Sequence, residues 1–256
     1  MKRLIVFLLI IVLASCSRNN KIGYTVPVVD PTNNYDTRSV GVSANDLLSS
    51  QKYKVINLDI CYVIKHPLPK TVIDDAVNFL GRYCNKPGGV YVHERQIPMQ
   101  GWKLYVNDLM TIEKIYRTKF EKAGKNGMDT LGLFILVTEG DYYIENVLGV
   151  AYKNTSVALF DGIISNNSGG LTQPSRETML STVLRHEIGH MLGLVNTGSD
   201  MQTPHQDETH GKHCDNEQCL MYHKMQTTDI LSILTGNTIP DLDANCQADL
   251  KANGGK

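Results

Sequence analysis

The sequence predicts an α/β domain in which a twisted, mixed sheet of about five strands packs against helices. Three observations lead to this fold class. Strand-like and helix-like segments alternate along the chain from about residue 51. The segment 131–137 (LGLFILV) is a continuous apolar run, as expected for a strand buried on both faces. The chain has 256 residues, 42% of them hydrophobic, which is enough to bury a substantial core.

Five segments have the short length and the β-branched or alternating apolar character of strands. A polar turn (Lys153-Asn154-Thr155) separates the last two, which indicates a hairpin. The predicted strands are 53–64, 90–97, 131–137, 147–152 and 156–160.

Three longer segments place their apolar residues at helical spacing, and they cover 70–83, 106–120 and about 175–192. Pro87-Gly88-Gly89 interrupts the chain after the first helix, and Pro174 and Ser175 provide start signals for the third. Residues 162–174 are predicted to be a polar loop and 226–235 a short helix. The polar tail to Lys256 is expected to be frayed.

The N-terminus has the organisation of a secretory leader. Lys2 and Arg3 precede ten apolar residues at 4–13, and ten helical residues span roughly 15 Å, about half of a bilayer core. Residues 13–16 (LASC) resemble the lipobox of bacterial lipoproteins. This resemblance implies removal of residues 1–15 and a lipid on Cys16 that anchors the protein in the bacterial cell envelope, with the outer membrane as the expected location. Residues 16–50 would then form a flexible tether and residues 51–256 the domain.

Charge and hydropathy narrow the class of partners. The 25 basic and 26 acidic side chains give a net charge of −1, which argues against a nucleic-acid-binding protein. No segment after the leader approaches 18 consecutive apolar residues. The lipid is therefore the expected contact with the membrane, and the domain is expected to be a monomer.

The third predicted helix contains the motif His186-Glu187-Ile188-Gly189-His190. Residues four apart lie on the same face of a helix, so two imidazoles at this spacing can bind one zinc ion. Glu187 can then reach a water on the metal and act as general base. Gly193 is suited to end the helix in a left-handed turn.

Two histidines do not complete a catalytic zinc site, which usually has three protein ligands and a water. The continuation of the chain offers Asn196, His205, His210 and His213 as the third ligand. The spacing of these residues does not choose among them.

The motif with Gly193, followed by His213-Cys214, Cys219 and Met221, resembles the metzincin metalloproteases and most closely the archaemetzincins. Their Cys-x4-Cys-x-Met pattern matches CDNEQCLM at 214–221. The resemblance covers about residues 183–222. It implies a zincin-like fold with an upper part (51–193), in which the sheet packs on an active-site helix and a backing helix. A small irregular lower part (194–256) would contain a Met-turn at Met221.

The chain departs from the family pattern at the third metal ligand. The pattern puts a histidine at position 196, where this chain has Asn196, and His213 follows only after an insertion. The resemblance assigns the ligand role to His213, because the cysteine–methionine pattern accompanies it. Asn196 is at the right spacing but an amide is a poor zinc ligand, and His205 and His210 remain further alternatives.

The cysteines provide a second departure. The family's additional zinc site needs a later Cys-x-x-Cys pair, and only Cys246 follows here, so that site is not expected. In an oxidising compartment Cys214 and Cys219 are predicted to form a disulfide, with zinc binding by this pair as the alternative. Cys61 with Cys84 is a second candidate pair, in which Cys246 could replace either residue.

These features predict a zinc-dependent peptidase that hydrolyses a peptide or protein substrate. Zinc would polarise the scissile carbonyl and acidify a water, with Glu187 as general base. The strand at 147–152 is a candidate for the sheet edge beside the cleft, where a peptide could add antiparallel. The alternative is a non-catalytic or latent surface-binding lipoprotein, in which the inserted segment 194–213 covers the cleft.

Overall fold

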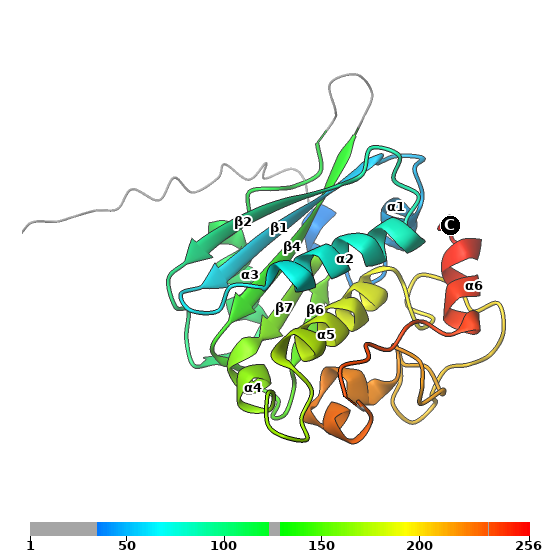
Figure 1. Cartoon of the computed structure of the whole chain (residues 1–256). Helices are drawn as coiled ribbons and strands as arrows, with labels where there is room; N and C mark the ends of the chain where they lie inside the picture. Colours follow the sequence, from blue (N-terminus) through cyan, green and yellow to red (C-terminus); the bar gives the residue numbers. More distant parts are fainter. Residues whose placement is uncertain (1–34, 123–128, 235) are drawn as a thin grey trace, which may run out of the picture.

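The computed structural model describes residues 35–122, 129–234 and 236–256. Its centre is a five-stranded sheet with the strand order β2-β1-β4-β7-β6 (Figure 1). All neighbouring strands are parallel except β6, which runs antiparallel to β7 and forms one edge. The strands are β1 (Val55–Val63), β2 (Val90–Ile97), β4 (Thr130–Thr138), β6 (Gly149–Lys153) and β7 (Ser156–Phe160). A separate short parallel pair joins β3 (Lys103–Leu104) to β5 (Asp141–Tyr142).

Helices cover both faces of this sheet. α2 (Lys70–Tyr83) and α5 (Arg176–Met191) pack against each other across one face, whereas α3 (Val106–Tyr116) covers the other (Figure 1). Successive residues of β1 point to opposite faces of the sheet: Leu58 packs on the side of α2 and α5, and Cys61 packs on the side of α3. β4, at the centre, is buried along almost its whole length, as its uninterrupted apolar sequence predicts. The predicted mixed α/β fold is therefore confirmed.

Most predicted elements are present, but some of their ends differ. The helix expected over 106–120 ends at Tyr116, because the backbone of Arg117 is extended, with ψ 133°. The buried guanidinium of Arg117 donates to Glu113 on α3 and to the Gly132 carbonyl on β4. The predicted loop 162–174 begins with a further helix, α4 (Asp161–Asn166).

The domain begins before residue 51, so the described part of the predicted tether is wrong. Residues 35–48 contain η1 (Tyr35–Thr37) and α1 (Ala44–Leu48). Tyr35, Leu47 and Leu48 belong to the hydrophobic core, and the two leucines are 0% exposed. Their side chains are scattered among polar neighbours, so no periodic pattern marked them. The predicted leader, Cys16 and residues 17–34 lie outside the described residues.

The lower part of the domain is small and irregular, as predicted. It contains two 3-10 turns, η3 (His223–Gln226) and η4 (Thr228–Ser232), in place of the expected short helix at 226–235. The C-terminal tail is not frayed: α6 (Ala244–Ala252) buries Leu250, and the Lys256 backbone N–H donates to the Tyr83 carbonyl. Within the described ranges no helix has the length and apolarity required to cross a membrane.

Candidate metal centre and active site

The candidate metal centre is built on the C-terminal half of α5. Ser175 caps this helix by accepting a hydrogen bond from the Thr178 backbone N–H, as the start signals predicted. The helix lies between the sheet and the lower part of the domain (Figure 1). It ends where Gly193 adopts φ +90°, which confirms the expected left-handed turn.

Three histidines converge beneath α5, and each is oriented by a backbone carbonyl. His186 Nδ1 lies 2.8 Å from the Leu220 carbonyl, His190 Nδ1 2.9 Å from that of Leu194, and His213 Nδ1 2.8 Å from that of His210. A carbonyl can only accept, so each Nδ1 carries the proton and each Nε2 keeps its lone pair. Metal-binding histidines are held in this way in proteins.

The three ligand atoms fit one small cation. The Nε2 atoms of His186 and His190 are 3.1 Å apart, and all three ligand atoms lie within 4.8 Å of one another. Tetrahedral zinc with Zn–N bonds of about 2.1 Å needs nitrogen atoms roughly 3.4 Å apart. His213 Nε2 is buried and has no hydrogen-bond partner in the structure. The Nε2 lone pairs of His186 and His190 face each other, and that of His213 has no donor. A bound cation would satisfy all three buried lone pairs.

Burial keeps these imidazoles neutral, which is the form that binds a metal. Burial and the neighbouring His213 lower the pKa of His190 to about 3. Burial also lowers the pKa of His186 well below its ordinary value, and it lowers that of His213. The site therefore binds few protons at neutral pH.

Glu187 lies between the histidines and the edge strand. Its Oε2 accepts a 2.6 Å hydrogen bond from the Ala151 N–H on β6, while its Oε1 is buried without a hydrogen-bond partner. Burial raises the pKa of Glu187 to about 8, and the Ala151 N–H opposes this effect. One oxygen is thus fixed in place, and the other has no hydrogen-bond partner among the described residues.

Met221 forms the floor under the motif helix. It is fully buried, and a Cβ at Gly189 would lie 2.4 Å from its sulfur. Met221 therefore packs directly on the helix between the two histidines, as the Met-turn prediction implies.

The structure separates the four candidates for the third ligand. Only His213 joins His186 and His190. The Asn196 amide donates to Gln206, and His210 lies against Asp207 with Nδ1 2.6 Å from its carboxylate. His205 points into a separate cluster of cysteines.

The disulfides expected from the sequence are not formed: Cys61, Cys84, Cys214, Cys219 and Cys246 are all free. Cys61 cannot pair with Cys84, because Cys61 faces α3 and Cys84 belongs to the core on the opposite face of the sheet. Cys214 and Cys219 lie near each other, but both belong to a larger buried cluster. The sequence pattern predicted that they are neighbours, and the bond between them was the wrong inference.

Sequence reasoning also missed a group beside the metal centre. The imidazoles of His210 and His223 stack with ring centroids 3.6 Å apart, and both lie near the Asp207 carboxylate. His223 follows Met221 by two residues, but no role could be assigned to it from the sequence. The stacking depends on the fold of the inserted segment, which no periodic pattern reveals.

Comparison with known proteins supports the fold. No family model matches the sequence, and no curated protein matches it. Among solved structures, the chain is similar to the crystal structure of an archaemetzincin from Methanopyrus kandleri, with a TM-score of 0.52 and 16% sequence identity. The match covers 80% of this chain and 97% of that chain. The protein thus has a metzincin-like fold of the archaemetzincin type.

Proposed function

We propose that the protein is a zinc-dependent peptidase whose metal ligands are His186, His190 and His213. The observation that carries this proposal is the convergence of three buried, carbonyl-oriented histidines with Glu187 beside them. Three neutral imidazoles are a ligand set that suits zinc, and they leave a fourth position for a water. The metzincin-like fold is consistent with this assignment.

The proposed chemistry follows from the different surroundings of the two carboxylate oxygens of Glu187. Zinc in such a site polarises a carbonyl and lowers the pKa of a bound water towards neutrality. The Ala151 N–H holds Glu187 Oε2, so Oε1 is the oxygen that accepts the proton of the attacking water. Glu187 then transfers this proton to the leaving amine nitrogen, which completes peptide hydrolysis.

The substrate class follows from the edge strand. β6 is the last strand of the sheet, and its Ala151 contacts Glu187 directly. An extended peptide can pair with such an edge through its backbone, which gives affinity with little demand on sequence. A cavity of about 330 Å³ lies where the chain enters β6 and could receive a substrate side chain; it is lined by apolar residues that include Trp102 and Val147 and by polar residues that include Lys103, Asp141 and Glu145.

The predicted leader indicates where in the cell this activity would take place. We propose that Cys16 is acylated and that the peptidase acts at a membrane surface in the bacterial cell envelope. Membrane fractionation of cells that express the full chain or Cys16→Ser tests this. The wild-type chain is expected with the membranes and the variant in the soluble fraction; membrane association of both would contradict the proposal.

The peptidase proposal is tested with the full chain purified in detergent. Zinc content and cleavage of a mixed peptide library, with and without a chelator, are measured for the wild type and for Glu187→Gln. The wild type is expected to cleave in a chelator-sensitive manner, and the variant to keep its zinc but lose turnover. Unchanged cleavage by Glu187→Gln would disprove the mechanism, and zinc without cleavage in the wild type would favour a binding protein.

The ligand assignment has its own test. His213→Ala is expected to lose the catalytic zinc, because only two histidines would remain. Asn196→Ala is the matched control, since Asn196 is exposed and hydrogen-bonded to Gln206. Retention of this zinc by His213→Ala, or its loss in Asn196→Ala, would contradict the assignment.

A further inference from the structure

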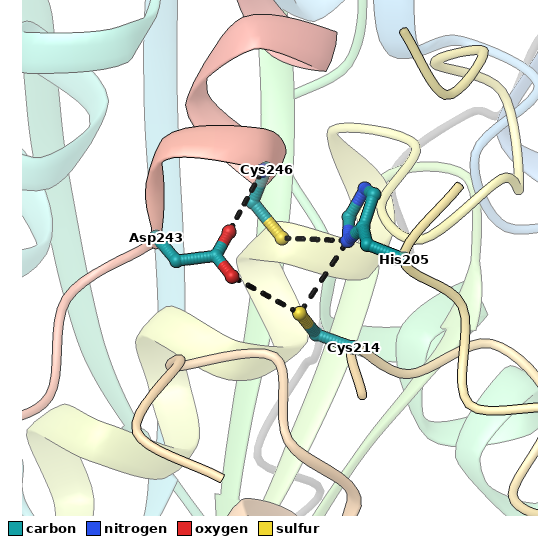
Figure 2. Close-up of side chains that lie close together, drawn as sticks. All are labelled: His205, Cys214, Asp243 and Cys246. Atoms are coloured by element: carbon teal, nitrogen blue, oxygen red, sulfur yellow. Dashed lines mark hydrogen bonds between the residues drawn. The ribbon is translucent and has the colours of Figure 1, made fainter. Parts of the chain in front are cut away.

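A second group of metal-binding side chains is buried at the junction of the inserted loop, the segment before Met221 and α6. It comprises His205, Cys214, Cys219 and Cys246, all at most 2% exposed. Figure 2 shows His205, Cys214, Cys246 and the Asp243 carboxylate directed at a common centre, and their ligand atoms all lie within 4.8 Å of one another. The segment 205–219 and the distant helix α6 thus place one imidazole and three thiols together.

The separations suit one zinc ion. Cys219 Sγ lies 3.6 Å from Cys246 Sγ, and His205 Nδ1 lies 3.4 Å from Cys214 Sγ and 4.0 Å from Cys246 Sγ. With Zn–S bonds of about 2.3 Å and Zn–N bonds of about 2.1 Å, a tetrahedral site needs sulfur atoms roughly 3.8 Å apart and nitrogen–sulfur pairs roughly 3.6 Å apart. Disulfide sulfurs are bonded at about 2.0 Å, so these contacts are not disulfides.

His205 is held in the orientation of a metal ligand. Its Nε2 lies 2.8 Å from Asp249 Oδ2, so Nε2 carries the proton and Nδ1 presents its lone pair to the sulfur atoms. Asp249 is fully buried on α6, and its other oxygen accepts a hydrogen bond from the Gln202 N–H. A buried carboxylate behind a ligating imidazole is a recurrent arrangement in zinc sites.

Cys219 has the surroundings of a thiolate. Its sulfur accepts from the backbone N–H groups of Met221 and Asp243, both at 3.4 Å. Zinc binds thiolate rather than thiol, and two N–H donors directed at one sulfur stabilise the negatively charged form.

Asp243 is the competing ligand, but its oxygens have other partners. Oδ1 caps α6 by accepting from the Cys246 N–H, and Oδ2 accepts from the Asn216 amide at 3.1 Å. Cys214 Sγ also lies 3.3 Å from Oδ2. Asp243 is therefore a positioning residue that orients Cys246 and Cys214 around the centre.

We propose that His205, Cys214, Cys219 and Cys246 bind a second, structural zinc ion in a Cys3His site. Four protein ligands leave no open position, which is typical of a structural rather than a catalytic site. A Cys-x-x-Cys pair is absent from the sequence, and a histidine from the inserted loop supplies the missing ligand. The ion ties this loop to α6 and fixes Cys214, the neighbour of His213.

The inference is tested on the full chain by zinc analysis and by cobalt substitution. Wild type is expected to bind two zinc ions, and its cobalt form to show the intense charge-transfer absorption of cobalt–thiolate bonds. His186→Ala is expected to lose one zinc and keep this absorption. Cys219→Ser is expected to lose or strongly weaken the absorption, and Asp249→Asn to weaken binding at this site by about 10–100-fold.

Substitutions of His205 and Asp243 test which of the two residues is the fourth metal ligand. His205→Cys offers a thiolate in place of the imidazole and is expected to retain the second metal, whereas His205→Ala loses it. Asp243→Asn keeps a cap for α6 and is expected to retain it as well. Loss of the metal in Asp243→Asn with retention in His205→Ala would assign the ligand role to Asp243 and overturn the Cys3His set.

Zinc content and cobalt absorption of the wild-type chain decide the question even if a cysteine variant does not fold. A single zinc ion, with no cobalt–thiolate absorption, would overturn the inference. Two zinc ions with cobalt–thiolate absorption but no peptide cleavage would support this site and contradict only the proposed peptidase.

Discussion

Glu187 on α5 and Ala151 on β6 are joined by a 2.6 Å hydrogen bond from the Ala151 N–H to Oε2. The bond fixes the proposed general base against the edge strand that is proposed to bind substrate. The separation between α5 and β6 therefore controls where Oε1 lies. That separation is small at Gly149, where a Cβ would lie 2.5 Å from Val183 Cγ1 and 3.2 Å from Glu187 Cγ.

Gly149→Ala is therefore expected to lower peptidase turnover while the zinc content stays unchanged. The added methyl group displaces Glu187 and costs about 1–3 kcal/mol of stability through overpacking. Turnover, zinc content and urea unfolding measure the three effects. Gly81→Ala is the matched control, because nothing lies within 4 Å of a Cβ there and Gly81 is inside α2. Equal turnover in the two variants would refute the prediction.

The packing of Met221 beneath the motif helix leads to a second prediction. Gly189→Ala places a methyl group 2.4 Å from the Met221 sulfur, so either the helix or the lower part must move. We expect lower zinc affinity at the three-histidine site and a loss of about 1–3 kcal/mol of stability. Zinc titration and denaturant unfolding measure these quantities.

The double variant Gly189→Ala/Met221→Ala tests the cause. Removal of the Met221 side chain vacates the space that the new methyl group needs, so the two substitutions are expected to be non-additive. Full additivity in unfolding free energy would show that Met221 is not the residue displaced by the methyl group.

The sequence predicted the features that depend on local periodicity or short motifs. The two histidines and Glu187 on α5, Ser175 as its cap and Gly193 as its end all follow from spacing within one helix. The sheet was also predictable, since the apolar run of β4 differs from the amphipathic pattern of α2. These signals are contained within single segments.

Contacts between distant segments could not be predicted. His205 looked like one of several candidates for the catalytic zinc, but it lies among Cys214 and Cys246 because Asp249 on α6 orients it. The helical character of α6 depends on the Asp243 cap and on the burial of Leu250 rather than on a strong periodic pattern. The expected cysteine pair was only part of a cluster that three segments create together.

The corrected domain boundary gives a third prediction. Leu48 is fully buried in the main core, although it lies in the segment first interpreted as a tether. Leu48→Ala is expected to cost about 2–5 kcal/mol of unfolding free energy, as for other buried leucines. Val42→Ala is the control, because Val42 in the same segment is 60% exposed. Similar, small effects of both substitutions on denaturant unfolding would restore the tether interpretation.

The buried thiol of Cys84 predicts how stability depends on alkaline pH. Burial raises the pKa of Cys84 to about 12, against about 8.5 for a free cysteine. Between these values the folded state keeps its proton while the unfolded state loses it, so the folded state binds more protons. The unfolding free energy must then fall as pH rises, with a limiting slope of about 1.4 kcal/mol per pH unit from this group.

Urea unfolding of the full chain at several pH values between 8 and 11 measures this slope. The buried Tyr152, whose pKa burial also raises, contributes in the same direction at higher pH. Cys84→Ala removes one titrating group, so it is expected to flatten the decline between pH 9 and 11 even though its small cavity lowers stability at every pH. An unchanged slope in this variant would mean that the folded protein releases the Cys84 proton as readily as the unfolded chain does.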